Sequence, residues 1–271
     1  MRLMVKKSIH SFLIFFILIF FIFQNSFADG GSSSRHGGVL VLAVGSDPKS
    51  FNPVIAKETS TTVVTSLMFE GLVTLDAESL QVVPLLAKGW SVSEDGLTWT
   101  FFLRDDVVWN DGHPFTADDV VFTFRDLIYN DAVPNSARDI FTIDGKEIKV
   151  IRVDDHTVQF ILPLKFSPFL RALGQSILPR HRLSGIVREG KFAFTWGIDA
   201  RPDEIVATGP FRLKRYQPGE RVILERNPHY WKRSADGDAL PYLDGVIMLI
   251  VQNHDAVVLK FLEGDVDYCL V

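Results

Sequence analysis

The chain has 271 residues, of which 47% are hydrophobic and 23% charged, and a formal net charge of −5. This moderately acidic balance argues against binding to nucleic acid or to an anionic membrane surface. Cys269 is the only cysteine, so it has no disulfide partner within the chain, and no spacing of cysteine and histidine supports a zinc site.

Residues 1–28 have the pattern of a secretory signal peptide. Basic residues precede an apolar run over residues 12–23, which suits a signal-peptide core but is too short to span a bilayer. Small side chains at Ser26 and Ala28 predict cleavage after Ala28; an uncleaved anchor is the alternative. No cysteine lies near this site, so a lipoprotein anchor is excluded and we expect a Gram-negative periplasmic protein. Cleavage would remove three of the 28 basic residues and none of the 33 acidic ones, which gives a net charge of −8.

The next segments predict a leader, a strand and a helix. Residues 29–37 are rich in Gly and Ser, which indicates a flexible leader. Residues 39–44 form a continuous apolar run, as expected for a strand in a buried sheet. Residues 59–68 have a spacing compatible with a helix, which we expect to end before Phe69-Glu70-Gly71.

Residues 86–122 carry the densest local signals in the chain. Asp95-Gly96 predicts a tight turn, and residues 97–103 predict a β-branched and aromatic strand. Residues 107–109 predict a second short strand, stopped by a turn over residues 110–112. The alternation along the first strand places Trp99, Phe101 and Leu103 on one face.

The middle of the chain predicts a capped helix and a pair of strands. Thr116 is placed to cap a helix that begins at Ala117, with two aspartates favourably near the positive end of the helix dipole. Residues 148–153 and 157–162 predict two strands joined by a short polar turn.

The last third of the chain predicts a hairpin, a strand and a helix. Residues 211–216 and 221–226 would form the hairpin around a turn that contains Pro and Gly. Residues 246–251 predict a second buried strand, and residues 255–262 a helix. The apolar side of that helix would consist of Val257, Val258, Phe261 and Leu262.

The string over residues 86–122 resembles the signature of the family 5 extracellular solute-binding proteins, the peptide and nickel receptors of ABC importers. Other family landmarks occur in the same order, from about residue 38 to the last residue. Matches within the string are Leu86-Ala87, Trp90, Ser93, Asp95-Gly96, Trp99, Phe101, Leu103-Arg104, Val107, Trp109, Asp111-Gly112, Pro114, Thr116-Ala117 and Asp119-Val120. Matches outside it are residues 38–43, Phe51-Asn52-Pro53, residues 69–73, 208–211, 226–231 and 262–267.

The resemblance implies an α/β fold of the periplasmic binding protein-like kind, type II and cluster C-like. Residues 38–70 and 203–271 would belong to a hinge lobe, and residues 71–202 to an inserted α+β domain. Chains of the family are much longer than this one. We therefore expect that the second large lobe is missing and that the chain is an N-terminal half, a fragment of a longer receptor.

No pattern typical of an enzyme active site is present. The sequence lacks a Gly-x-Ser-x-Gly elbow, a His-Glu-x-x-His pair and a phosphate-binding loop motif. We interpret the acidic pairs at 105–106, 118–119 and 154–155 as parts of turns or of a helix start. The histidines are scattered: His113, His156 and His229 are placed at turns, and His181 and His254 have no partner at metal-ligand spacing. Trp90, Trp99, Trp109 and Trp231 are interpreted as packing residues, with stacking platforms for a ligand as the alternative. We expect no enzyme activity, no cofactor and no metal site.

The resemblance also indicates which residues would face a ligand. In related peptide receptors the segment just after the Phe51-Asn52-Pro53 turn lines the cleft, which here means Lys57, Glu58 and Thr59; ordinary surface-loop residues are the alternative. Oligopeptides are the first expectation for a small-solute ligand, since an extended peptide can pair its backbone with protein groups. Nickel chelates, haem and oligosaccharides stay open. The partner would be the membrane permease of an ABC importer, and a regulatory or non-functional fragment is the competing hypothesis.

Overall fold

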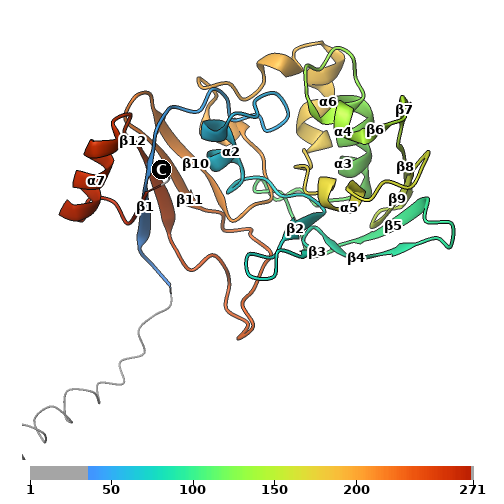
Figure 1. The fold of residues 1–271 in the computed structure, drawn as a ribbon, viewed down its shortest axis with the longest axis horizontal. Helices are drawn as coiled ribbons and strands as arrows, with labels where there is room; N and C mark the ends of the chain where they lie inside the picture. Colours follow the sequence, from blue (N-terminus) through green and yellow to red (C-terminus); the bar gives the residue numbers. More distant parts are fainter. Residues whose placement is uncertain (1–35, 270–271) are drawn as a thin grey trace, which may run out of the picture. The chain divides into compact units, whose positions relative to one another are not determined.

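The computed structural model describes residues 36–269, so the predicted signal peptide and residues 29–35 of the predicted leader lie outside it. Its largest sheet has the strand order β10-β11-β12-β1-β13 (Figure 1). The strands are β1 (Val39–Val44), β10 (Phe211–Gln217), β11 (Arg221–Arg226), β12 (Gly245–Ile250) and β13 (Tyr268–Cys269). β1 runs parallel to β12 and to β13, with Val41 opposite Ile247, and β10 and β11 form the predicted hairpin. The first and last described strands therefore pair with each other.

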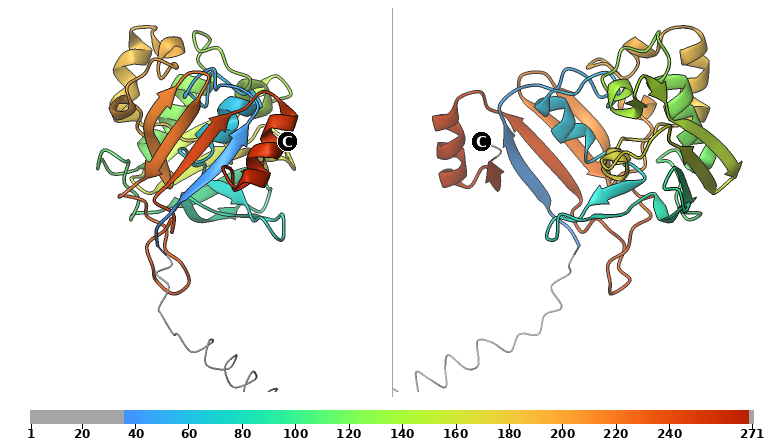
Figure 2. Two further views of the ribbon diagram at one scale, coloured as in Figure 1. Left: turned by 90° about the vertical axis from the view of Figure 1, so that its left-hand side faces the viewer. Right: turned by 45° about the vertical axis from the view of Figure 1, so that its right-hand side comes forward.

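The two faces of this sheet bury different parts of the chain. On one face, a core that includes Leu42 and Met248 extends to α2 (Thr59–Thr65) and to residues 178–205. On the other face, Ala43 meets Val257 of α7 (His254–Glu263). Figure 2 shows α7 on the side of the sheet opposite α2. Because successive side chains point to opposite faces and both faces are covered, the sequence of β1 is continuously apolar.

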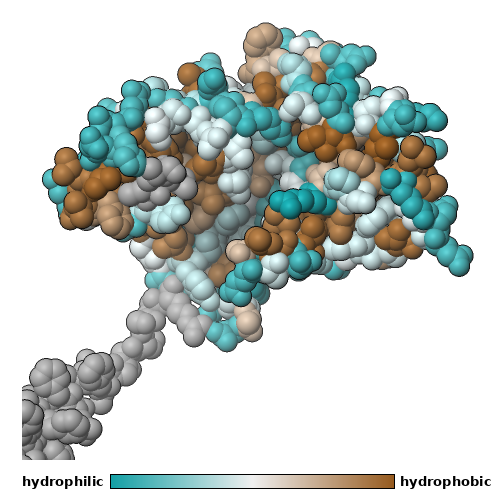
Figure 3. All heavy atoms as spheres, viewed as in Figure 1, coloured by the Kyte–Doolittle hydropathy of each residue, from teal (hydrophilic) through white to brown (hydrophobic). Residues whose placement is uncertain are grey.

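α7 confirms the predicted helix but corrects its predicted apolar side. The side chain of Asn253 caps its start by accepting a hydrogen bond from a backbone N–H of the first turn at 3.0 Å. Val257 is buried, whereas Val258 and Phe261 are exposed and Leu262 is 74% exposed. Only the side of α7 that faces the sheet is covered, because a helix can place only a narrow stripe of its side chains against a flat sheet. Hydrophobic side chains consequently reach the surface over α7 (Figure 3).

A second sheet, of order β4-β5-β9-β8, has a core of its own. Its strands are β4 (Ala87–Val92), β5 (Thr98–Leu103), β8 (Lys149–Asp154) and β9 (Thr157–Ile161). β4 and β5 form a hairpin around the predicted turn, where Gly96 has a φ of +72° that favours glycine. Phe101 and Leu103 are buried on one face, as predicted, and the ring of Phe101 packs edge-on against Phe160 with centroids 5.6 Å apart.

Between the two hairpins of this sheet, the structure corrects one predicted element and adds one that was not predicted. Residues 107–109 do not form the predicted short strand: Val108 makes a single bridge with Pro114, because the turn between them folds the chain straight back. The predicted helix is confirmed as α3 (Ala117–Phe122), and the N–H of Thr116 donates to Asp119 Oδ2 at 3.0 Å. α3 continues directly into η1 (Thr123–Ile128), a π-helix that no sequence pattern indicated.

The remaining elements are short connections. They are β2 (Val73–Leu75), β3 (Val82–Pro84), α4 (Ala137–Phe141), β6 (Thr142–Ile143), β7 (Lys146–Glu147), α5 (Phe169–Ala172), α6 (Arg180–Arg188), η2 (Phe192–Phe194) and η3 (Pro202–Glu204). Leu183 and Phe192 belong to the core of the first sheet, whereas most of the buried hydrophobic residues between 72 and 177 belong to the core of the second sheet. The predicted division at residues 71 and 202 stays a prediction. None of the described helices is long and apolar enough to cross a membrane.

Candidate functional site

The three residues implied to face a ligand, Lys57, Glu58 and Thr59, lie together at the start of α2. Glu58 is the extended residue before the helix, and the hydroxyl of Thr61 donates to its carboxylate at 2.6 Å, which lowers the pKa of Glu58. Thr61 in turn accepts a hydrogen bond from the backbone N–H of Lys49 at 3.1 Å. Glu58 therefore fixes the entry of the chain into α2, whereas Lys57 and Thr59 are exposed.

Lys57 lines a hollow of about 270 Å³ beside α2. Its ammonium group lies 3.4 Å from Oε1 of Gln175. The side chain stays exposed, but the walls of the hollow partly desolvate it, which lowers the pKa of Lys57. The walls combine the hydroxyl-bearing residues Thr62 and Ser66 with the apolar side chain of Phe141, and none of the described lining residues is acidic. One cation, several hydroxyl groups and an apolar wall suit a polar organic solute.

A larger hollow, of about 790 Å³, adjoins the first, and Ser66 and Gly174 line both. Its other walls come from β2, from Arg171 and from the segment that contains Tyr230. A Cβ atom on Gly71 would lie 2.6 Å from the carbonyl carbon of Gly174, so the two backbones touch here and only glycine fits. This backbone contact fixes the wall that the two hollows share.

Glu70 also lines the larger hollow. Through its buried carboxylate, two of the family landmarks, residues 69–73 and 226–231, contact each other. Glu70 is 6% exposed, and it accepts hydrogen bonds from the hydroxyl of Tyr230 at 3.0 Å and from Nε1 of Trp231 at 3.1 Å. The guanidinium group of Arg104 lies 4.0 Å from the centroid of the Trp231 ring. Burial raises the pKa of Glu70 to about 7, although both hydrogen bonds oppose that shift. Both landmarks were recognised in the sequence. Their contact joins residues 160 positions apart, so no local sequence pattern predicts the contact.

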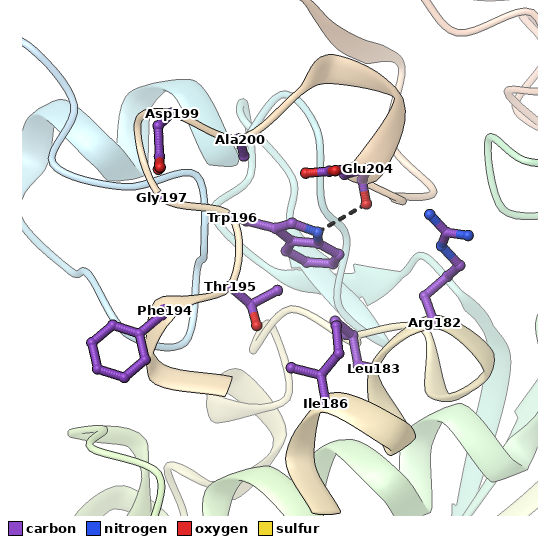
Figure 4. Close-up of a pocket in the computed structure, with 10 residues that line it drawn as sticks. All are labelled: Arg182, Leu183, Ile186, Phe194, Thr195, Trp196, Gly197, Asp199, Ala200 and Glu204. Carbon is purple, nitrogen blue, oxygen red and sulfur yellow. Dashed lines mark hydrogen bonds between the residues drawn. The ribbon is translucent and has the colours of Figure 1, made fainter. Parts of the chain in front are cut away.

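Figure 4 shows a third hollow, of about 490 Å³, beside α6. Trp196 lies between Leu183 and the backbone carbonyl of Glu204, to which its Nε1 donates at 2.9 Å. Trp196 has a left-handed φ of 56°, which is strained for a residue with a large side chain. In this conformation its carbonyl oxygen accepts hydrogen bonds from the N–H of Phe51 at 2.8 Å and the hydroxyl of Ser50 at 3.0 Å. We therefore assign Trp196 to holding the turn that leads into α2.

The acidic pairs, which the sequence interpretation placed in turns or at a helix start, also form ion pairs that it did not predict. Their partners are Lys88 for Asp105, Arg104 for Asp106 and Arg152 for Asp155. Asp119 is buried, which raises its pKa, and accepts hydrogen bonds from the backbone N–H groups of Thr116 and Arg180 and from Nε1 of Trp109. Trp109 is fully buried, and Trp90, Trp99 and Trp231 pack against the second core.

One cluster of polar side chains was not expected from the sequence. Nε2 of His181 lies 2.9 Å from Oδ2 of Asp111, and the rings of His113 and His181 stack with centroids 4.0 Å apart. The start of α6 returns to the turn at residues 110–112 to make this contact, across 70 positions of sequence. Nowhere in residues 36–269 do three or more His, Cys, Asp or Glu side chains form a group that could hold a metal ion.

Sequence comparison identifies the family of this chain. Residues 81–271 match the family described as bacterial extracellular solute-binding proteins, family 5 Middle. A probable ABC transporter-binding protein of Deinococcus radiodurans is 32% identical over 228 residues, which cover 82% of this chain and 38% of that protein. The dipeptide-binding protein of Escherichia coli is 30% identical over 234 residues, which cover 78% of this chain and 42% of that protein.

Comparison of structures gives the same result. The periplasmic binding protein DppA of Helicobacter pylori, solved in complex with the peptide STSA, matches with a TM-score of 0.71 and 28% sequence identity. The match covers 86% of this chain and 46% of that one, so the chain spans less than half the length of the proteins it resembles. The fold is the mixed α/β fold of periplasmic binding proteins, as the resemblance implied. Since the family match extends over more than half of its residues, the chain belongs to family 5 of the bacterial extracellular solute-binding proteins.

Proposed function

We propose that this chain forms one wall of the ligand site of a periplasmic receptor for an ABC importer, and that the ligand is an oligopeptide. The observation that carries the proposal is the pair of adjoining hollows beside the start of α2, one of them lined by Lys57. The relative from Escherichia coli is a dipeptide-binding protein, and the protein from Helicobacter pylori was solved with a peptide. Both support a peptide as the ligand class.

The chemistry of the smaller hollow suits the polar groups of a peptide. A peptide presents carbonyl oxygens and a terminal carboxylate, which accept hydrogen bonds, and the ammonium group of Lys57 offers three donors. In the described part of the chain that ammonium group has one hydrogen-bond partner, the neutral amide of Gln175 at 3.4 Å. A ligand oxygen would therefore not have to displace a carboxylate to reach it. A bond to a ligand carboxylate, in which both partners are charged, is stronger than a 3.4 Å bond to a neutral amide.

The proposed site needs a second wall. Small-molecule sites bury about 70–90% of the ligand surface, and hollows on one side of a ligand cannot reach that fraction. Relatives about twice as long supply further protein surface. We therefore expect the 271-residue chain alone to bind peptides weakly, and the intact receptor to deliver its ligand to a membrane permease.

Weak binding to a defined surface is best tested by NMR. Titration of the chain with tetra-alanine should shift the backbone amide signals of Lys57, Thr59 and Gln175. Lys57→Ala should weaken the response, whereas Lys88→Ala, which removes a lysine paired with Asp105 in the other sheet, should leave it unchanged. Loss of the response in both variants, or no shift in the unmodified chain, would reject the peptide site.

The same titration separates the other ligand classes. A nickel–histidine chelate, haem and an oligosaccharide would each be added in place of the peptide. Shifts at the start of α2 with one of these compounds and none with the peptide would keep the receptor role and change its ligand. No response to any of them would favour a regulatory or non-functional fragment. Affinity in the micromolar range or tighter, measured by calorimetry, would contradict the need for a second wall.

A further inference from the structure

An arginine-rich hollow of about 450 Å³ lies between η1 and α6, and it shares no lining residue with the two hollows beside α2. Arg125 and Asp126 of η1 line one side, and Arg180, Ser184 and Arg188 of α6 line the other. Three guanidinium groups and one carboxylate give the hollow an excess of two positive charges, in a chain whose net charge is −5. α6 packs against α3 and η1 (Figure 1), so the two sides are held at a fixed separation.

The residues of α6 follow one face of the helix. Arg180, Ser184 and Arg188 are spaced four apart, and side chains at this spacing are neighbours on a helix surface. Nε of Arg188 donates to the backbone carbonyl of Ser184 at 3.3 Å, and its two terminal amino groups have no partner among residues 36–269. Arg180 makes one long contact, 3.6 Å from Asp118, a carboxylate that it shares with Arg152. Both guanidinium groups therefore keep donors that are not used by these contacts.

The opposite side of the hollow is built on an uncommon element. Arg125 is held by the neighbouring Asp126, whose two carboxylate oxygens accept from its Nε and Nη2, each at 2.9 Å. This bidentate pair fixes the plane of the guanidinium group and leaves Nη1 free to donate. Both residues lie on the π-helix, in which the N–H of Tyr129 donates to the carbonyl of Phe124 at 3.0 Å. π-helices are rare and occur frequently at functional sites.

The geometry points to a binding site for a phosphate group in this hollow, held by Arg180 and Arg188 with the hydroxyl of Ser184 and the outer edge of Arg125. The planar fork of a guanidinium group matches two oxygens of a phosphate, and several such groups can share the remaining oxygens. The carboxylate of Asp126 lines the same hollow, where its bidentate ion pair with Arg125 offsets its negative charge. The phosphate would belong either to a soluble phosphorylated compound or to a lipid headgroup. This site is separate from the proposed peptide site and does not depend on it.

Inorganic phosphate is the probe for the first test, with sodium chloride added to hold the ionic strength constant. The Nε–H signals of Arg125, Arg180 and Arg188 should shift in a saturable manner as phosphate is added, and the Arg125 signal stays available as the reporter when the other two arginines are replaced. The double variant Arg180→Gln/Arg188→Gln should bind at least about tenfold more weakly, because it loses two charge-assisted donors. Arg182→Gln is the matched control, since Arg182 lies on the same helix but lines the hollow of Figure 4.

Both substituted side chains are exposed, and the backbone N–H that Arg180 donates to Asp119 survives the change, so the double variant should fold. An unchanged unfolding midpoint checks this. A linear, non-saturating response, or equal weakening by Arg182→Gln, would overturn the proposal. Sedimentation with phosphatidylcholine vesicles, with and without phosphatidylglycerol, identifies the source of the phosphate. Binding to the anionic vesicles that the double variant loses supports a headgroup, and phosphate binding without vesicle binding supports a soluble compound.

Discussion

Replacing Glu70 by Gln tests whether one buried carboxyl group makes the stability of this protein depend on pH. Burial raises the pKa of Glu70 from 4.5 to about 7, against the hydrogen bonds from Trp231 and Tyr230. Unfolding would return the pKa to its ordinary value, so between these two pH values the folded protein binds more protons than the unfolded chain. The free energy of unfolding therefore falls as the pH rises through this window, by about 3 kcal/mol for this group. The stabilisation is complete below pH 4.5 and is lost above about pH 7.

Gln keeps the shape of the side chain and one oxygen that can accept from Trp231, but it cannot ionise. Urea unfolding of both proteins between about pH 5 and about pH 8 measures the effect, since the midpoint and slope give the free energy of unfolding. Relative to the unmodified protein, Glu70→Gln should gain about 3 kcal/mol of stability across the full window. Glu78→Gln, at an exposed position, controls for the loss of one negative charge. Parallel pH curves for the unmodified protein and Glu70→Gln would refute the reasoning.

Two further pairs of substitutions test the packing. Gly71→Ala should destabilise the fold by several kcal/mol, because the added Cβ atom would lie 2.6 Å from the backbone of Gly174, whereas Gly89→Ala meets nothing within 4 Å and should have little effect. Equal unfolding midpoints for these two variants would contradict the backbone contact. Val257→Ala should cost about 2 kcal/mol in urea unfolding, whereas Leu262→Ala should cost less than about 0.5 kcal/mol. A larger loss at Leu262 would mean that something covers the outer side of α7.

Elements defined by neighbouring residues were predictable from the sequence. The hairpin of β4 and β5 follows from a turn that needs glycine at residue 96, and the start of α3 follows from the position of Thr116 just before two aspartates. One of them, Asp119, accepts a hydrogen bond from the backbone N–H of Thr116. The short strand expected at residues 107–109 failed because a strand needs a partner along its length. The turn that follows allows Val108 a single bridge.

Burial was harder to predict than secondary structure. The sequence shows that α7 has an apolar side, but the width of the covered stripe depends on what else packs there, and periodicity does not report this. Val257 is buried and Phe261 is not, although both belong to the same predicted side. The π-helix was also missed. The sequence of η1 carries no breaker residue that would mark the change from α3 to a π-helix at Thr123.

The landmarks that identify the family and the residues that would face a ligand are different sets. Glu70 and Trp231 belong to two landmarks and are joined by a hydrogen bond, and Asp119 belongs to a third and accepts from three donors. Side chains used in this way hold the framework. Lys57 lies outside the landmarks and keeps its ammonium group accessible in a hollow. Proteins that share these landmarks can therefore bind different ligands. The ligand class has to be inferred from the few side chains that are not used to hold the framework.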